Sequence, residues 1–279
     1  MSKTFLFLYG SMKSGTTWLS KNLESSPQYW NGGIKEWRFW PQYFNPHDGV
    51  HVADHHSVTG RPSQVFRSHA RLNPDEFIRS VTNKCVSESR LRVLGDLTPS
   101  IGLQPQELLS LRSLMAHAGL QCKGLFLMRD PVSRTESELR MKIKNNRPGF
   151  HLETANLKHS IPAQLDEIIR KQIMSLVAKS RYEISLEICD SISTEIPYKT
   201  VFAENLFSQV TMDEVCKFIG IDAIKIDARV YNVGRKLPIS EDSRRFIASK
   251  LRGTYELLAQ REGYDVLPNQ WRQSMELLD

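Results

Sequence analysis

The chain has 279 residues, enough for one large domain with a full hydrophobic core. Its composition is that of an ordinary globular protein, and no apolar run approaches the about 20 residues that a membrane-spanning helix needs. The net charge of +6 is mild and spread along the chain, so it suits an anionic ligand and gives no indication of nucleic-acid binding. We expect no signal peptide, and the four widely spaced cysteines are typical of reduced thiols in a cytoplasmic protein.

Short apolar runs alternate with longer segments of helical periodicity. The predicted strands are 4–9, 91–94, 124–128 and 199–202. The predicted helices are 16–24, 75–85, 105–118, 132–145, 163–191, 212–220 and 241–261. Irregular segments are expected at 45–60 and 147–160, the second a candidate substrate loop. The alternation predicts an α/β fold, one domain over 1–279, whose mostly parallel central sheet is flanked by helices and binds ligands at the carboxyl ends of its strands.

A phosphate-binding loop is predicted directly after the first strand. The sequence GSMKSGTTWL at 10–19 joins that strand to a helix start, where backbone N–H groups and the positive helix end favour an anion. The pattern G-x-x-x-x-G-K-[ST] of ATP-binding loops would place a lysine where Thr16 stands. Here Lys13 lies three residues earlier, inside the loop. The displaced lysine would meet a different part of the nucleotide, which favours sulfuryl over phosphoryl transfer.

A second phosphate anchor is predicted where the strand at 124–128 ends. Arg129 follows this strand directly, and Pro131 fits the first turn of the next helix. Ser137 lies about two turns into that helix. The guanidinium and the hydroxyl could together grip one phosphate group.

These two anchors resemble those of the sulfotransferases that use 3′-phosphoadenosine 5′-phosphosulfate (PAPS). The family's 5′-phosphosulfate loop resembles the run Lys13, Ser14, Gly15, Thr16, Thr17 and Trp18. Its 3′-phosphate site resembles Arg129 with Ser137, joined by a late basic loop that contains Arg235 and Lys236. Further similar segments are 180–182, 201–206 and 217–221. The first resembles the segment that carries a nucleotide-proximal tyrosine, so Tyr182 is a candidate for stacking on adenine. The segment 95–101 departs from the family, because it lacks the lysine and tyrosine that often flank its Thr-Pro pair.

The resemblance implies transfer of a sulfuryl group from PAPS to a hydroxyl or amine acceptor, a carbohydrate or small metabolite that attacks the sulfur in line. Thr16 and Thr17 would donate to the 5′-phosphate, and Lys13 would neutralise the charge that grows on the bridging oxygen. The identity of the acceptor and the oligomeric state are not predicted. No metal is required.

Two residues are candidates for the general base. Glu36 lies in IKEWRFW at 34–40, which resembles the Lys-Glu-x-x-aromatic-aromatic motif of glycan-type and many bacterial sulfotransferases, where the glutamate is the base. The neighbouring aromatic residues at 37, 39 and 40 would raise its pKa toward neutrality. His69, in FRSHA at 66–70, resembles the histidine base of sulfotransferases that act on small alcohols and phenols. We prefer Glu36, because the Thr98-Pro99 segment agrees with the glutamate class.

Other interpretations are weaker. Four histidines at 47–56 lie beside two aspartates, but their spacing matches no standard zinc pattern, and we expect no metal site there. A kinase or NTPase shares the strand, loop and helix; it would need a lysine at position 16 and an acidic Mg²⁺ ligand, which Asp96 could mimic. A non-catalytic nucleotide or anionic-glycan binder would have lost its base, yet Glu36 and His69 are both present.

Overall fold

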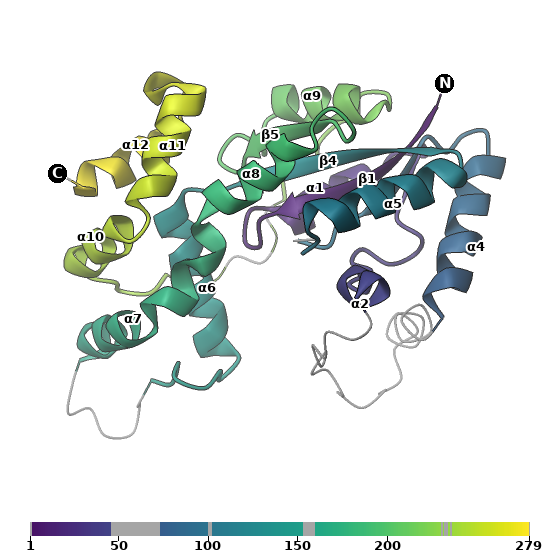
Figure 1. The fold of residues 1–279 in the computed structure, drawn as a ribbon. Coiled ribbons are helices and arrows are strands. Elements are labelled where there is room, and N and C mark those ends of the chain that lie inside the picture. Colours follow the sequence, from purple (N-terminus) through teal and green to yellow (C-terminus); the bar gives the residue numbers. More distant parts are fainter. Residues whose placement is uncertain are drawn as a thin grey trace.

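The structure is a computed structural model that describes residues 2–45, 73–99, 102–152, 160–229, 231, 234 and 236–278. A five-stranded sheet, in the order β2-β3-β1-β4-β5, forms its centre (Figure 1). The strands are β1 (Lys3–Gly10), β2 (Tyr29–Trp30), β3 (Val93–Asp96), β4 (Leu120–Met128) and β5 (Tyr198–Phe202). Every neighbouring pair is parallel. The predicted α/β fold with a mostly parallel sheet is confirmed.

Helices cover both faces of this sheet. The α-helices of the described residues are α1 (Thr16–Leu23), α2 (Trp40–Phe44), α4 (Pro74–Ser87), α5 (Pro105–His117), α6 (Pro131–Lys144), α7 (Ile161–Val177), α8 (Tyr182–Ser191), α9 (Gln209–Ile219), α10 (Glu241–Ser249), α11 (Arg252–Glu262) and α12 (Asn269–Met275). Short 3-10 helices lie at Ala178–Ser180, Tyr264–Val266 and Glu276–Leu278. Prolines occupy the first turn of several helices, where the missing N–H leaves no hydrogen bond unmade.

The central strand β1 shows how the two layers form. Alternate side chains point to opposite faces: Phe5 and Phe7 enter one core cluster, and Leu6 and Leu8 enter the other. The first cluster includes buried residues of α4, α5 and α8, and the second includes those of α1 and α9. Because β1 is covered on both faces, it is apolar almost throughout instead of alternating.

Two long predicted helices are each divided in the structure. The segment 163–191 breaks into α7 and α8 around the 3-10 turn Ala178–Ser180. The buried Ser180 hydroxyl accepts a hydrogen bond from Arg134 Nη1 at 2.9 Å and lies 3.0 Å from Thr135 Oγ1, both on α6. Contacts with another helix therefore favour the break, although the local sequence is helical throughout. The segment 241–261 likewise divides at Lys250 and the buried Leu251 into α10 and α11.

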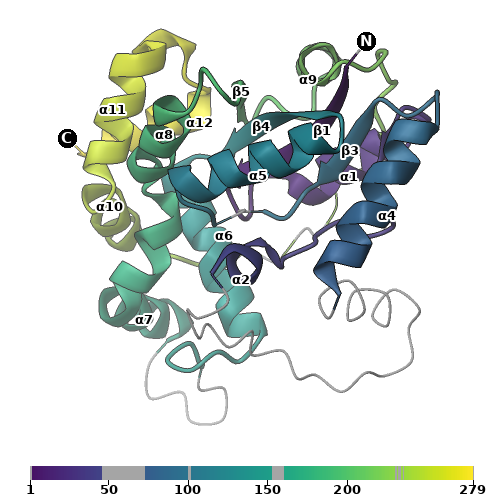
Figure 2. The same ribbon diagram turned by 45° about the vertical axis from the view of Figure 1, so that its right-hand side comes forward.

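Three of the described strands and α-helices were not predicted from the sequence: β2, α2 and α12. The first two are very short, and α12 belongs to a C-terminal group with α10 and α11 that lies beside α6 and α8, away from α4 at the other end of the sheet (Figures 1 and 2). Trp271 of α12 is completely buried in this group, and Tyr255 OH of α11 donates to Asp130 Oδ1 at 2.7 Å. The C-terminal helices thus pack against the start of α6, where the second phosphate anchor was predicted.

The four cysteines are free and buried. Over the described ranges, none of the helices combines the length and the apolar character that crossing a membrane requires.

Candidate active site

The loop between β1 and α1 has a backbone shape that its sequence explains. Gly15 has φ 85°, and a Cβ at this position would lie 2.8 Å from Leu206 Cδ2, so only glycine fits. Lys13 also adopts a left-handed conformation, with φ 73°. The Ser14 side chain is buried, with its Oγ 2.5 Å from Ser11 Oγ, so this hydroxyl holds the loop together. A strand, a compact loop and a helix therefore follow one another as predicted, with the Ser14 side chain buried inside the loop.

The helix that follows begins at this loop without a side-chain cap. Gly15 is the N-cap of α1, and no side chain in the described part of the chain caps the helix. The first N–H groups of an α-helix have no acceptor within the helix itself, so they face the segment that precedes it. The Trp18 ring is buried in the core, 1% exposed and edge-on to Phe207 at 5.1 Å. The helix start can therefore bind an anion through its backbone and the two threonine hydroxyls.

Arg129 connects the second anchor to the loop. It follows β4, the neighbour of β1, and its Nη1 donates to the Lys13 carbonyl oxygen at 3.2 Å. Tyr182 OH donates to the Arg129 carbonyl oxygen at 2.8 Å and accepts from the Arg129 N–H at 3.2 Å. The same hydroxyl lies 3.3 Å from Ser11 Oγ. Tyr182 thus joins the backbone of Arg129 to the side chain of Ser11 in the loop.

Tyr182 differs from its expected role. Its side chain is only 1% exposed, and its ring packs edge-on against Phe126 at 5.5 Å and beside Trp271 at 6.1 Å. The ring therefore has no free face on which adenine could stack. Sequence reasoning placed the residue near the nucleotide site but could not show that its ring is part of the core.

Within the part of the chain that the structure describes, the cations of the two anchors lack carboxylate partners. In the described ranges, no carboxylate lies within ion-pair distance of Lys13, Arg129 or Arg140, the last of which is on α6. Burial lowers the pKa of Lys13; Glu138 opposes this shift, and the charges of nearby arginines, among them Arg140 and Arg129, reinforce it. Burial and Arg129 also lower the pKa of Arg140. Like charges held together in this way create a site that an anion would stabilise.

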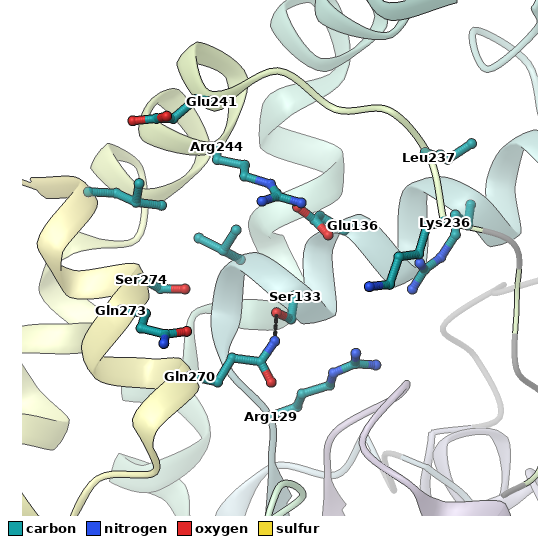
Figure 3. Close-up of a pocket in the computed structure, with 13 residues that line it drawn as sticks. Arg129, Ser133, Glu136, Lys236, Leu237, Glu241, Arg244, Gln270, Gln273 and Ser274 are labelled. Atoms are coloured by element: carbon teal, nitrogen blue, oxygen red, sulfur yellow. Dashed lines mark hydrogen bonds and ion pairs between the residues drawn. The ribbon is translucent and has the colours of Figure 1, made fainter.

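A cavity of about 590 Å³ opens beside Arg129, between α6, α10 and α12. Figure 3 shows Arg129, Lys236 and Arg244 arranged around Ser133, whose Oγ accepts a hydrogen bond from Gln270. Arg244 is paired with Glu136 at 2.8 Å, whereas Lys236 has no carboxylate partner within the described segments. The cationic wall of this cavity is therefore contributed by elements far apart in the sequence.

The predicted late basic loop reaches the same region. Lys236 lines the cavity with Arg129 and Arg140, and a Cβ on Gly234 would lie 3.7 Å from Arg140 Nε. Ser137 is on the same face of α6, one turn from both Ser133 and Arg140. Arg235 lies outside the described residues. Arg140 lies at this described site but was not predicted from the sequence. It follows Ser137 by three residues on a predicted helix, and this spacing could have indicated it.

The Lys-Glu motif lies on the opposite side of the loop. Lys35 Nζ is 2.9 Å from Glu36 Oε1, 3.3 Å from Thr17 Oγ1 and 3.5 Å from Thr16 Oγ1. Arg38 Nε donates to Glu36 Oε2 at 2.7 Å, and Arg38 Nη2 contacts the same oxygen. The motif therefore brings a carboxylate beside the start of α1, with a cation on each of its oxygens. Sequence reasoning named Glu36 but assigned no role to Lys35 or Arg38.

A buried carboxylate holds this motif in place. Asp96, at the end of β3 and 1% exposed, accepts hydrogen bonds from Trp37 N at 3.1 Å and Trp40 Nε1 at 2.8 Å. It also accepts from Thr98 N at 3.0 Å and Thr98 Oγ1 at 2.7 Å, and Leu97 N donates to the Lys35 carbonyl oxygen at 2.9 Å. Because both Asp96 oxygens are engaged and buried, this carboxylate is not placed to bind the Mg²⁺ that a kinase would need.

The expected effect of the aromatic residues on Glu36 is wrong. Trp37, Phe39 and Trp40 are each at most 4% exposed and belong to the core beneath the sheet. Burial raises the pKa of Glu36, but the charges and hydrogen bonds of Lys35 and Arg38 outweigh it, so the pKa lies below its ordinary 4.5. The aromatic neighbours of Glu36 in the sequence do not reveal that Lys35 and Arg38 contact its carboxylate.

The rival base His69 and the histidines at 47–56 lie outside the described residues. In the ranges that are described, no group of three or more histidine, cysteine, aspartate or glutamate residues is arranged to hold a metal ion.

Comparisons with known proteins agree on the fold. The sequence matches no protein-family model and no curated protein. Among solved structures, a sulfotransferase from Alicyclobacillus acidocaldarius is similar, with a TM-score of 0.58 and 18% identity over 98% of this chain and 100% of that one. At this identity the likeness establishes the fold, and the chain therefore has the α/β fold of that sulfotransferase.

Proposed function

We propose that the protein transfers a sulfuryl group from PAPS to a hydroxyl or amine of a carbohydrate or small metabolite. One observation carries the proposal: within the described residues, Lys13, Arg129 and Arg140 form a cluster without carboxylate partners beside the loop that leads into α1. PAPS has a phosphosulfate at one end and a phosphate at the other, and the two anchors offer cations to both. The residues present therefore fit this donor.

The two ends of the donor are assigned to different elements. The N–H groups and hydroxyls of Thr16 and Thr17 bind the 5′-phosphate, with help from the positive end of α1. Arg129 and Lys236, which line the cavity beside α6, bind the 3′-phosphate together with Ser137, which lies one helical turn from the cavity residues Ser133 and Arg140. The Arg129 to Lys13 hydrogen bond of 3.2 Å couples the two sites, because movement of the arginine shifts the loop backbone.

Glu36 acts as the general base. The acceptor oxygen or nitrogen attacks sulfur while its proton passes to the Glu36 carboxylate, and the bond from sulfur to the bridging oxygen breaks with its electron pair kept by the nucleotide. Lys13 neutralises the charge on that bridging oxygen, and Lys35 lies between Glu36 and the threonines of the helix start. Preorganised cations of this kind typically contribute about 10²–10³ in rate.

Transfer of ³⁵S from labelled PAPS to a panel of sugars, amino sugars and phenols tests the proposal directly. We expect turnover with at least one acceptor and binding of the product adenosine 3′,5′-bisphosphate. Glu36→Gln should reduce turnover by about 10²–10⁴ and leave nucleotide binding nearly unchanged, because proton transfer belongs to the chemical step. If Glu36→Gln keeps near-full turnover and His69→Ala is inactive, then His69 is the general base.

Lys21→Ala is a matched control for Lys13→Ala. Lys21 lies at the far end of α1, with its side chain 54% exposed and paired with Glu24 at 2.9 Å, so its removal should change neither binding nor turnover. If the wild-type protein binds no adenosine bisphosphate and transfers no label, the proposed function is refuted.

A further inference from the structure

Arg38 is the polar residue in a run of buried aromatic side chains, and its backbone is strained. Its φ of 57° lies in the left-handed region, which residues other than glycine seldom adopt. The conformation is held from both sides, since Trp37 N donates to Asp96 and Arg38 N donates to Thr98 Oγ1 at 3.3 Å. The strain has a clear consequence, because it directs Arg38 onto Glu36 while its neighbours enter the core.

In this position Arg38 opposes the proposed chemistry. A general base works best when its pKa is near the operating pH, yet the two cations on Glu36 lower its pKa below 4.5. Lys35 is retained by the threonines of α1. Arg38 is different: its side chain is 49% exposed, and within the described residues Glu36 is its ion-pair partner. Arg38 is therefore the cation that can leave the carboxylate.

A second cation, Lys179, lies beside the nucleotide loop. Lys179 Nζ is 3.1 Å from Met12 Sδ in this loop and has no carboxylate partner in the described ranges. Arg38 is linked to the other end of the loop, because its partner Glu36 is joined through Lys35 to the threonines at the start of α1. Loss of hydration lowers the pKa of Lys179; Glu138 opposes this, and positive charges that include Arg38 add to it. Arg38 and Lys179 therefore both border the loop that would hold the sulfuryl group.

We propose that Arg38 and Lys179 form a subsite for an acid group of the acceptor, and that this acid group releases Glu36 by taking Arg38 from it. The inference rests on the proposed function and narrows the acceptor to molecules that carry a carboxylate, sulfate or phosphate near the reacting hydroxyl or amine. A guanidinium binds such groups through two parallel hydrogen bonds, so the exchange replaces one carboxylate partner of Arg38 by another.

Calorimetric titration of malonate into the protein saturated with adenosine 3′,5′-bisphosphate tests this subsite without knowledge of the acceptor. Malonate carries the acid groups, and malonamide is its neutral counterpart. We expect malonate to bind and malonamide not to bind. Arg38→Gln and Lys179→Gln should each weaken malonate binding by about tenfold, because each removes a charged donor.

Glu36→Gln gives the more decisive result, because it should strengthen malonate binding, whereas Arg38→Gln and Lys179→Gln should weaken it. If malonate and Glu36 compete for Arg38, removal of the Glu36 charge should tighten malonate binding by about threefold or more. A subsite independent of the base would not respond in this way. Arg252→Gln is the matched control: its side chain is 53% exposed, lies on α11 and is 3.9 Å from Glu256, and its loss should change nothing.

The outcomes separate the two proposals. No binding of adenosine bisphosphate contradicts the proposed function. Binding of the nucleotide together with unchanged malonate affinity in Arg38→Gln, or with weaker affinity in Glu36→Gln, overturns the acid-group subsite alone. Equal binding of malonamide and malonate overturns it as well.

Discussion

Replacement of Asp96 by asparagine isolates the hydrogen bonds that position Glu36. The substitution keeps the shape of the side chain but turns one acceptor oxygen into an N–H₂ donor. The oxygen Oδ1 serves Trp37 and Thr98, while Oδ2 serves only Trp40 Nε1. The amide will therefore orient its N–H₂ group toward Trp40, where a donor faces a donor and a single hydrogen bond is lost.

The expected cost follows from the burial of this site. A buried donor without an acceptor costs about 1–3 kcal/mol. Loss of hydration raises the pKa of Asp96, although the four hydrogen bonds that it accepts oppose this shift, so a neutral amide regains part of the loss. We expect Asp96→Asn to lower the free energy of unfolding by about 1–2 kcal/mol. Asp96→Ala should cost more, because it also leaves Trp37 and Thr98 N–H groups unpaired.

Urea unfolding of Asp96→Asn, Trp40→Phe and the double variant measures the interaction directly. Phenylalanine has no N–H, so the asparagine should cost about 1 kcal/mol less in the Trp40→Phe background than in the wild type. If the two substitutions are additive within about 0.5 kcal/mol, the bond from Trp40 to Asp96 does not account for the stability of this segment.

Three further results are expected. Lys13→Ala should lower kcat by about 10²–10³ with a smaller effect on the affinity for adenosine 3′,5′-bisphosphate, measured by single-turnover kinetics and calorimetry. Arg129→Ala should mainly weaken binding of adenosine 3′,5′-bisphosphate, and an equally large loss of affinity for the 3′-dephosphorylated nucleotide would contradict its assignment to the 3′-phosphate. Since Lys35 and Arg38 outweigh burial and hold the pKa of Glu36 below 4.5, the acid limb of the kcat/KM profile should lie below pH 4.5, and Arg38→Gln should move it to higher pH.

The sequence predicted the central features of the fold because their signals are local. A strand of buried apolar residues before a glycine loop, and an arginine directly after a second strand, needed no knowledge of distant contacts. The boundary between α7 and α8 could not be predicted, because the bonds from Ser180 to α6 favour the break. The burial of Tyr182 could not be predicted either. The residue lies in a segment with the pattern of an amphipathic helix, but its ring is buried between Phe126 and Trp271.

For the candidate site, the sequence indicated residue types better than it indicated their electrostatic surroundings. The Lys-Glu motif predicted the carboxylate beside the loop, and the structure places it there through Lys35 and the threonines of α1. The pKa of Glu36 depends on where the side chain of Arg38 goes, and this depends on a left-handed backbone fixed by Asp96 and Thr98, about 60 residues away.

The two halves of the site differ in charge balance, and this difference suits their proposed ligands. On the nucleotide side, Lys13, Arg129 and Arg140 have no carboxylate partners within the described residues, so a multiply charged donor binds without displacing an ion pair. On the acceptor side, Glu36 already holds two cations. An acid group that attracts Arg38 would remove one of them and raise the pKa of the base, while Lys35 stays with the threonines of α1. Water offers no acid group, so Glu36 would remain a weak base toward it, and the arrangement would favour transfer to the acceptor over hydrolysis of the donor.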